Sequence, residues 1–248
     1  MLAGWRERGL AASVAVDPAM PAADGPDITV VADAAAIPAG FSPSAVVLAV
    51  KPQNAAATLP HYARYAGSAV LLSIMAGRSI AGIADLVGPA AAIVRAMPNT
   101  PAAVRQGITV ACAGPGVTLD QRTLCDSLLA AIGTVAWTED EGLIDPVTAV
   151  SGGGPAYVFL LVELLERAAI EQGIPADLAR DLARQTIIGS GALLASSNED
   201  AAALRRAVTS PGGTTERALA VLMDEAAWPA ATSRAIAAAT ARARELAG

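Results

Sequence analysis

The stretch SAVVLAVKPQ, residues 44–53, contains six consecutive apolar residues followed by the only lysine in the chain and a proline. A short, continuous apolar run that stops at a proline is typical of a strand buried on both faces of a parallel sheet. The run predicts such a strand, with Lys51 and Pro52 at its carboxyl end. A compact ammonium is not interchangeable with a guanidinium, so Lys51 is either a selected ligand-binding residue or an incidental one.

Strand-like runs and helical segments alternate around this stretch. We expect strands at residues 28–33, 69–77, 91–101, 107–114 and 134–140, and helices at 54–65, 79–86 and 119–132. The alternation indicates an α/β domain whose mostly parallel sheet is covered by helices on both faces. Ligands of such sheets bind at the carboxyl ends of the strands, where AVKPQ, IMAG and MPNTP lie. Pro52 and Pro98 could also merely stop strands, and Gly77 could merely turn the chain.

The first residues, MLAGWRERGLAASVAVDP, have helical spacing up to Leu10 and then form a short alternating strand that ends at Asp17. In a dinucleotide-binding unit this order follows a first strand and a glycine-rich phosphate loop. We therefore expect a Rossmann-type sheet with its first strand missing, which leaves two sheet fragments with unpaired inner edges. A start codon assigned too far downstream is the interpretation we favour. Asp17 could accept hydrogen bonds from the ribose hydroxyls of NADH, whereas a 2'-phosphate would meet like charge.

The second half of the sequence is helical. Residues 158–173, VFLLVELLERAAIEQG, are apolar almost all round, which predicts a helix at the centre of a bundle or of a dimer interface. Two glycine-rich segments, 151–155 and 210–215, each precede a helix. Exposed backbone N–H groups at such positions can bind a carboxylate or phosphate, although both segments could also be breaks between packed helices. The predicted domains are residues 1–143 and 144–248.

The bulk composition narrows the class of protein. The net charge of -6 argues against binding to nucleic acid or to anionic membranes. Cys112 and Cys125 lack the spacing of a metal site and are expected to be buried thiols in a reducing cytoplasm, and His61 is expected to be a surface or packing residue. No leader or membrane-spanning run is expected. The mean hydropathy of +0.47 is high for a soluble chain, which predicts a large subunit interface.

The motifs AVKPQ, SIMAG, RAMPNTPA, SGGGPAYVF and VTSPGGTT, in this order and spacing, resemble pyrroline-5-carboxylate reductase. The resemblance implies a Rossmann domain followed by an all-α domain that forms a homodimer, with further assembly of dimers in many members. It also implies a cytoplasmic enzyme that reduces the cyclic imine 1-pyrroline-5-carboxylate to L-proline with NADPH or NADH, in proline biosynthesis. The chain has no lysine after Lys51, which favours imine reduction over the lysine-assisted ketone reduction of related dehydrogenases.

The resemblance also assigns roles to residues. Thr215 is implied as the catalytic hydroxyl that hydrogen-bonds the substrate nitrogen, although it could instead only cap a helix. Substrate binding is implied for Glu141, Ser151, Gly154, Gly213 and Thr214. Cofactor binding is implied for Ala49, Val50, Lys51, Pro52, Ala76 and Asn99. Asp17 is added to this set because it lies at the end of the short strand near the N-terminus.

The chain departs from the family pattern at two places. Gly153 stands where the family loop usually carries a second serine, which removes one hydroxyl from the expected pocket. In addition, Met1 falls inside the helix that follows the glycine-rich loop of the family. The alternative function is therefore a catalytically impaired relative that only dimerises or binds a small carboxylate.

Overall fold

A computed structural model describes residues 1–20 and 27–247. The chain divides into two compact units, one formed by Met1–Gly152 together with the C-terminal residues from Ala239, and one formed by Gly153–Ala238. Each unit is described by itself below. The domain division at residues 143 and 144 remains a prediction, since the packing groups the end of the last helix with the sheet.

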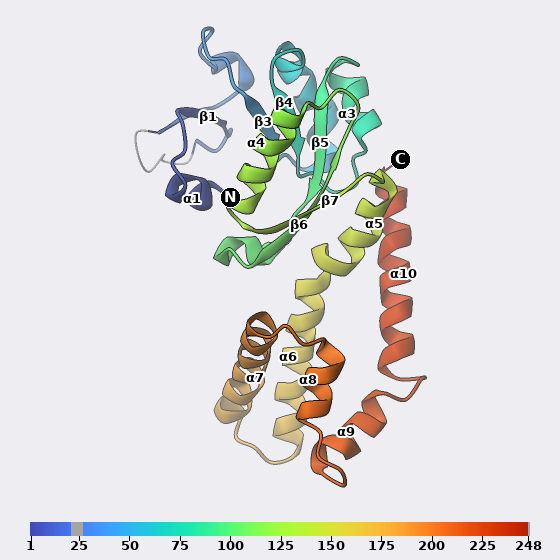
Figure 1. The fold of residues 1–248 in the computed structure, drawn as a ribbon. Helices are drawn as coiled ribbons and strands as arrows, with labels where there is room; N and C mark the ends of the chain where they lie inside the picture. The colour runs from blue at the N-terminus through green and yellow to red at the C-terminus, as the bar shows by residue number, and fades with distance from the viewer. Residues whose placement is uncertain (21–26, 248) are drawn as a thin grey trace. The chain divides into compact units, whose positions relative to one another are not determined.

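The first unit contains two sheets (Figure 1). Strands β1 (Ser13–Val16) and β2 (Ile28–Val31) form a parallel pair. The larger sheet has the order β3-β4-β5-β6-β7, with β3 Ala45–Leu48, β4 Val70–Ser73, β5 Ala92–Met97, β6 Gly107–Ala113 and β7 Gly133–Thr138. Among the strand pairs of the described residues, β5–β6 is antiparallel and the others are parallel. The short connection between these two strands explains the reversal, because a parallel neighbour requires a crossover of a dozen or more residues.

The two sheet fragments have the arrangement expected from the sequence. In the described part of the chain β1 pairs only with β2. Strand β3 lies at the edge of the larger sheet and there pairs only with β4. Val14 and Val16 of β1 nevertheless pack with Val46 of β3 around the buried residues Ile37 and Tyr65. The inner edges of β1 and β3 therefore border one common apolar cluster without pairing to each other.

Helices cover both faces of the larger sheet, as predicted (Figure 1). On one face Leu71 and Ile93 pack with Ile83 of α3 (Ile80–Val87) and with residues of α2 (Ala55–Thr58). On the other face Leu72 and Val94 pack with Leu129 of α4 (Leu119–Ala130). The expected helix over 54–65 is shorter than predicted, because Pro60 lacks an N–H and the chain continues as a 3-10 helix over Leu59–Tyr65. The chain begins with helix α1 (Leu2–Glu7).

The rest of the chain is helical. It comprises α5 (Ile144–Val147), α6 (Gly154–Glu171), α7 (Ala176–Ser196), α8 (Ala201–Ala207), α9 (Thr214–Leu222) and α10 (Trp228–Ala247). Helices α6 and α7 pack against each other. The fold class predicted from the sequence, a mostly parallel α/β sheet followed by helices, is confirmed.

The glycine-rich segment at 151–155 is not the loop that we expected. Residues Thr148–Gly152 form a π-helical turn that joins α5 to α6 almost without interruption. The hydroxyls of Thr148 and Ser151 donate to carbonyl oxygens four residues earlier, which holds the backbone in a helical path. Single π-turns of this kind occur frequently at functional sites.

The helical run Glu141–Glu171 is long and apolar enough, by length and composition alone, to span a membrane. No residue of α6 is buried within the chain, and Phe159 and Leu160 are 61% and 52% exposed. Apolar residues of α7, among them Leu182, Ile188 and Leu193, are also exposed. The helix that the sequence predicts to be buried on most of its surface is therefore uncovered in a single chain.

Candidate active site

The turns after β3, β4 and β5 meet at one edge of the larger sheet, because these strands are parallel and in register. The edge carries six of the predicted cofactor-binding residues, namely Ala49, Val50, Lys51, Pro52, Ala76 and Asn99. Arg78 ties two of these turns together, since its Nε and Nη2 donate to the carbonyl oxygen of Pro52 at 3.3 and 3.0 Å. The side chain of Lys51 is exposed, and its ammonium makes no hydrogen bond or ion pair within residues 1–20 and 27–247.

Two predicted cofactor residues also have local structural roles. Asn99 Oδ1 accepts a hydrogen bond from the backbone N–H of Ile108 at 3.0 Å, which closes the connection between β5 and β6. Asp17 directly follows β1, and its Oδ1 accepts from the N–H of Ala19 at 2.9 Å. One oxygen of Asp17 is thus engaged in a turn at the strand tip, the position that the sequence predicts for a ribose-binding acid.

A buried ion cluster lies near the carboxyl end of β5. The side chain of Arg95 is 3% exposed; its Nη1 lies 3.1 Å from Glu141 Oε1, and its Nη2 lies 2.9 Å from Asp145 Oδ1. The same Oε1 accepts from the backbone N–H of Ile80 at the start of α3, at 2.7 Å. The family resemblance implies a role for Glu141 but not for Arg95, whose only signal in the sequence is a single charge inside the apolar strand AIVRAM.

The π-helical turn packs against the end of β5. A Cβ added to Gly152 would lie 2.7 Å from Cε of Met97, so the end of the Met97 side chain would have to move to admit a larger residue. Ser151 belongs to this turn, and its Oγ donates to the carbonyl oxygen of Val147 at 3.1 Å. Within the first unit the structure thus brings Gly152 close to Met97, through a helical turn rather than through a loop.

The second unit contains the SPGGTT segment at the start of α9. Gly212 has φ +72 and donates its N–H to Glu216 Oε2 at 2.8 Å, and the N–H of Gly213 donates to the carbonyl oxygen of Ser210 at 3.0 Å. Gly213 is the N-cap of α9 and no side chain caps this helix, so Thr215 is not its capping residue. Thr214 and Thr215 are exposed at the first two positions of α9, where N–H groups have no partner within the helix.

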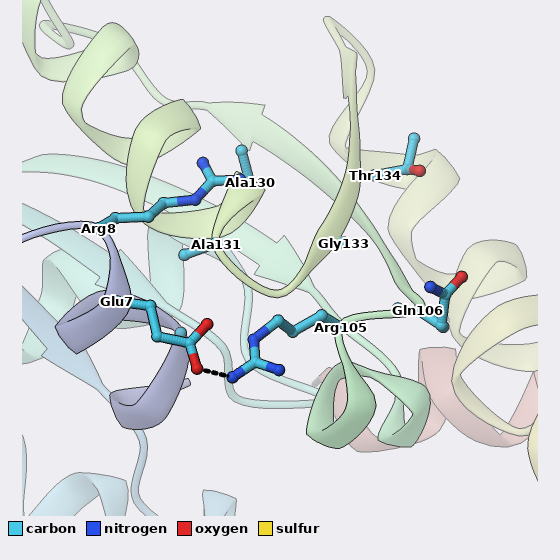
Figure 2. A pocket seen from close by; sticks show the side chains of 10 residues that line it. Glu7, Arg8, Arg105, Gln106, Ala130, Ala131, Gly133 and Thr134 are labelled. Carbon is cyan, nitrogen blue, oxygen red and sulfur yellow. Dashed lines mark hydrogen bonds and ion pairs between the residues drawn. The ribbon is translucent and has the colours of Figure 1, made fainter.

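A cavity of about 570 Å³ opens where β6 and β7 begin, which is also the edge at which β5 ends (Figure 2). Its lining includes the ion pair between Glu7 and Arg105, together with Arg8, Gln106 and Thr134. None of the predicted cofactor or substrate residues lines this cavity.

The two cysteines are free and buried, as expected. Burial raises the pKa of the Cys112 thiol, and the nearby carboxylates of Glu141 and Glu139 raise it further. Burial alone raises the pKa of Cys125 to about 12. Both thiols therefore remain protonated at neutral pH and are not nucleophiles.

Comparison with known proteins identifies the following similarities. Residues 141–246 match the family model described as pyrroline-5-carboxylate reductase dimerisation. The pyrroline-5-carboxylate reductase of Synechocystis sp. is 40% identical over 201 residues, which cover 81% of this chain and 74% of that one. The enzyme of the same name from Pseudomonas aeruginosa is 40% identical over 203 residues, which cover 82% and 74% of the two chains.

Solved structures give the same result. A pyrroline-5-carboxylate reductase from Coxiella burnetii is 35% identical with a TM-score of 0.82, and the match covers 89% of this chain and 82% of that one. The Plasmodium falciparum pyrroline carboxylate reductase, solved with NADP bound, is 28% identical with a TM-score of 0.78, and the match covers 92% and 86% of the two chains.

Proposed function

This chain belongs to the pyrroline-5-carboxylate reductase family, and we propose that it reduces 1-pyrroline-5-carboxylate to L-proline by hydride transfer from NAD(P)H, the last step of proline biosynthesis. The observation that carries this function is the 40% identity to named reductases over 81% of the chain. A match of that extent includes residues of both units. The alternative, a relative that only dimerises or binds a carboxylate, is not favoured for this reason.

The carboxyl edge of the sheet fits a dinucleotide. The ammonium of Lys51, which has no partner among the described residues, provides a positive charge for a phosphate. Arg78 holds the turns after β3 and β4 in a fixed relation to each other. Within residues 1–20 and 27–247 the other carboxylate oxygen of Asp17 has no hydrogen-bond partner and is available for a ribose hydroxyl. When bound here, NAD(P)H supplies the hydride, and the residues of the chain hold its nicotinamide end in place.

The substrate requires little chemical assistance, because an iminium carbon already attracts hydride. Placement of that carbon about 3 to 3.5 Å from the hydride donor supplies most of the rate enhancement. We propose that the Thr215 hydroxyl hydrogen-bonds the ring nitrogen and orients it. The N–H groups of Thr214 and Thr215 then bind the carboxylate of the substrate, and Gly213 supports the loop conformation through its bond to Ser210. Glu141, Ser151 and Gly154 complete the proposed substrate-binding set.

We propose that the protein works in the cytoplasm as a homodimer formed through its helical unit. Several such dimers could assemble further. Support comes from the dimerisation model that matches residues 141–246 and from the exposed apolar side chains on α6 and α7. A second copy of the chain would cover the apolar surface of the helical run Glu141–Glu171. The net charge of -6 also opposes attachment to an anionic membrane.

The test uses two proteins, because the inner edges of β1 and β3 are unpaired in the described part of the chain. One is the 248-residue chain, and the other carries before Met1 a first strand and a glycine-rich loop of the kind that the family resemblance implies. The assay follows the loss of NADPH or NADH absorbance upon addition of 1-pyrroline-5-carboxylate. We expect substrate-dependent oxidation in the extended protein and weak cofactor binding by the 248-residue chain. Background rates in both folded proteins would reject the function, and tight cofactor binding by the shorter one would reject the need for the added segment.

A further inference from the structure

The unusual feature of the larger sheet is a charge in its interior. Arg95 lies on β5 between Val94 and Ala96, which are 0% and 1% exposed, and its own exposed fraction is 3%. Its Nη1 and Nη2 bind Glu141 and Asp145, but its Nε is buried and has no hydrogen-bond partner among the described residues. Apolar residues often replace a buried ion cluster without loss of stability. Stability alone therefore does not account for an arginine at this position.

The two carboxylates that Arg95 binds lie on the connection that leads out of the sheet. Glu141 follows β7, and Asp145 belongs to α5, directly before the π-helical turn that carries Ser151. Arginine can reach both because its planar fork presents two nitrogens to two acceptors, whereas lysine presents one point charge. One side chain on a rigid strand thus holds the start of this connection at two positions.

The carboxylate of Glu141 is held on one side only. Its Oε1 accepts from both Arg95 Nη1 and the backbone N–H of Ile80, so that β5 and α3 fix it together. No hydrogen bond to Oε2 occurs in the described part of the chain, and the Glu141 side chain is 30% exposed. One oxygen is therefore anchored and the other remains available to a ligand.

We propose that Arg95 is a positioning residue that keeps the free Oε2 of Glu141 in place as a counter-charge for the cationic ring nitrogen of the substrate, an ionic interaction that does not need the single N–H of that nitrogen. This inference rests on the proposed function, since the substrate in its iminium form and the product L-proline both carry a positive charge on that nitrogen. An anchored carboxylate binds such a cation without first losing side-chain freedom, so Arg95 contributes to substrate binding without contact to the substrate.

The test compares Arg95→Met, Arg95→Lys and Glu141→Gln, with Arg122→Met as the control because Arg122 forms an exposed ion pair with Glu139 in the same unit. Calorimetry measures L-proline binding to the 248-residue chain. Kinetics use whichever protein of the preceding test turns over. We expect Glu141→Gln and Arg95→Met each to raise the Kd for L-proline and the KM for the imine by ~10-fold, with kcat changed less than about threefold and Arg95→Lys intermediate. The double variant should be no worse than either single variant, because both changes remove one interaction.

Glu141→Gln keeps an oxygen acceptor for Arg95 and Ile80, so it tests the proposal even if Arg95→Met fails to fold. An unchanged KM and Kd in Glu141→Gln, or additive effects in the double variant, would overturn the positioning role. If neither the wild-type protein nor any variant oxidises NAD(P)H, the proposed function fails. The L-proline affinities of the variants then still show whether Arg95 positions Glu141. Wild-type protein that binds no L-proline overturns it as well.

Discussion

At Thr215 the structure separates two roles that a hydroxyl can have at the start of a helix. Gly213 is the N-cap of α9 and no side chain caps the helix, so the Thr215 hydroxyl is not needed there. We expect Thr215→Ala to lower kcat/KM by ~10-fold or more, about 1.4 kcal/mol, with an unchanged melting temperature. Thr215→Ser should retain much of the activity. A drop in stability with normal turnover per folded molecule would contradict a catalytic role.

At Asp17 the local electrostatics predict a preference for NADH, or at most a weak preference for NADPH. The carboxylate at the tip of β1 accepts a hydrogen bond from Ala19 and would repel a 2'-phosphate. Asp17→Ser should therefore shift the ratio of kcat/KM values toward NADPH by about five- to tenfold, since two unit charges about 4 Å apart in water repel by about 1 kcal/mol. Asp33→Ser is the control, because Asp33 caps a 3-10 turn after β2. A wild-type enzyme that favours NADPH tenfold would show that Asp17 points away from the ribose.

Among the elements, β6 and β7 begin with two glycines that face each other too closely for a larger residue. Gly133 has φ +145 and lies opposite Gly107, and a Cβ at Gly133 would overlap the carbonyl oxygen of Gly107. Gly133→Ala should lower the free energy of unfolding by about 2 to 4 kcal/mol, measured by urea denaturation. Gly67→Ala is the matched control, since nothing lies within 4 Å of its added Cβ. Equal midpoints for the two variants would contradict this packing.

For the whole molecule, the apolar surface of α6 requires a partner. Leu160 is 52% exposed in the single chain and lies in the region that matches the dimerisation model. Leu160→Glu should convert the proposed dimer into a monomer in sedimentation analysis, because a charge would be buried unpaired at the proposed interface. Ser127→Glu adds the same charge to an exposed position on α4, outside that region, and should remain dimeric. A dimeric Leu160→Glu variant would place the interface elsewhere.

Sequence patterns predicted some features of the site better than others. The strand ends were predictable because apolar runs and prolines are local signals, and Lys51 and Pro52 follow β3 as expected. The helical path through Thr148–Gly152 was not, because it depends on hydroxyl bonds to carbonyl oxygens and on the close approach of Gly152 to Met97. Three consecutive glycines are equally compatible with a loop.

By itself, the sequence determined the order of strands and helices, the family and the residue types at the carboxyl edge, because these depend on local periodicity and on motifs read along the chain. Only the tertiary structure decided which groups engage one another. Arg95 meets Glu141 and Asp145, respectively 46 and 50 residues further along the chain, only after β5 and the connection following β7 have packed together. The partner of a buried charge depends on which distant segments share the same low-dielectric interior, and no local pattern encodes that choice.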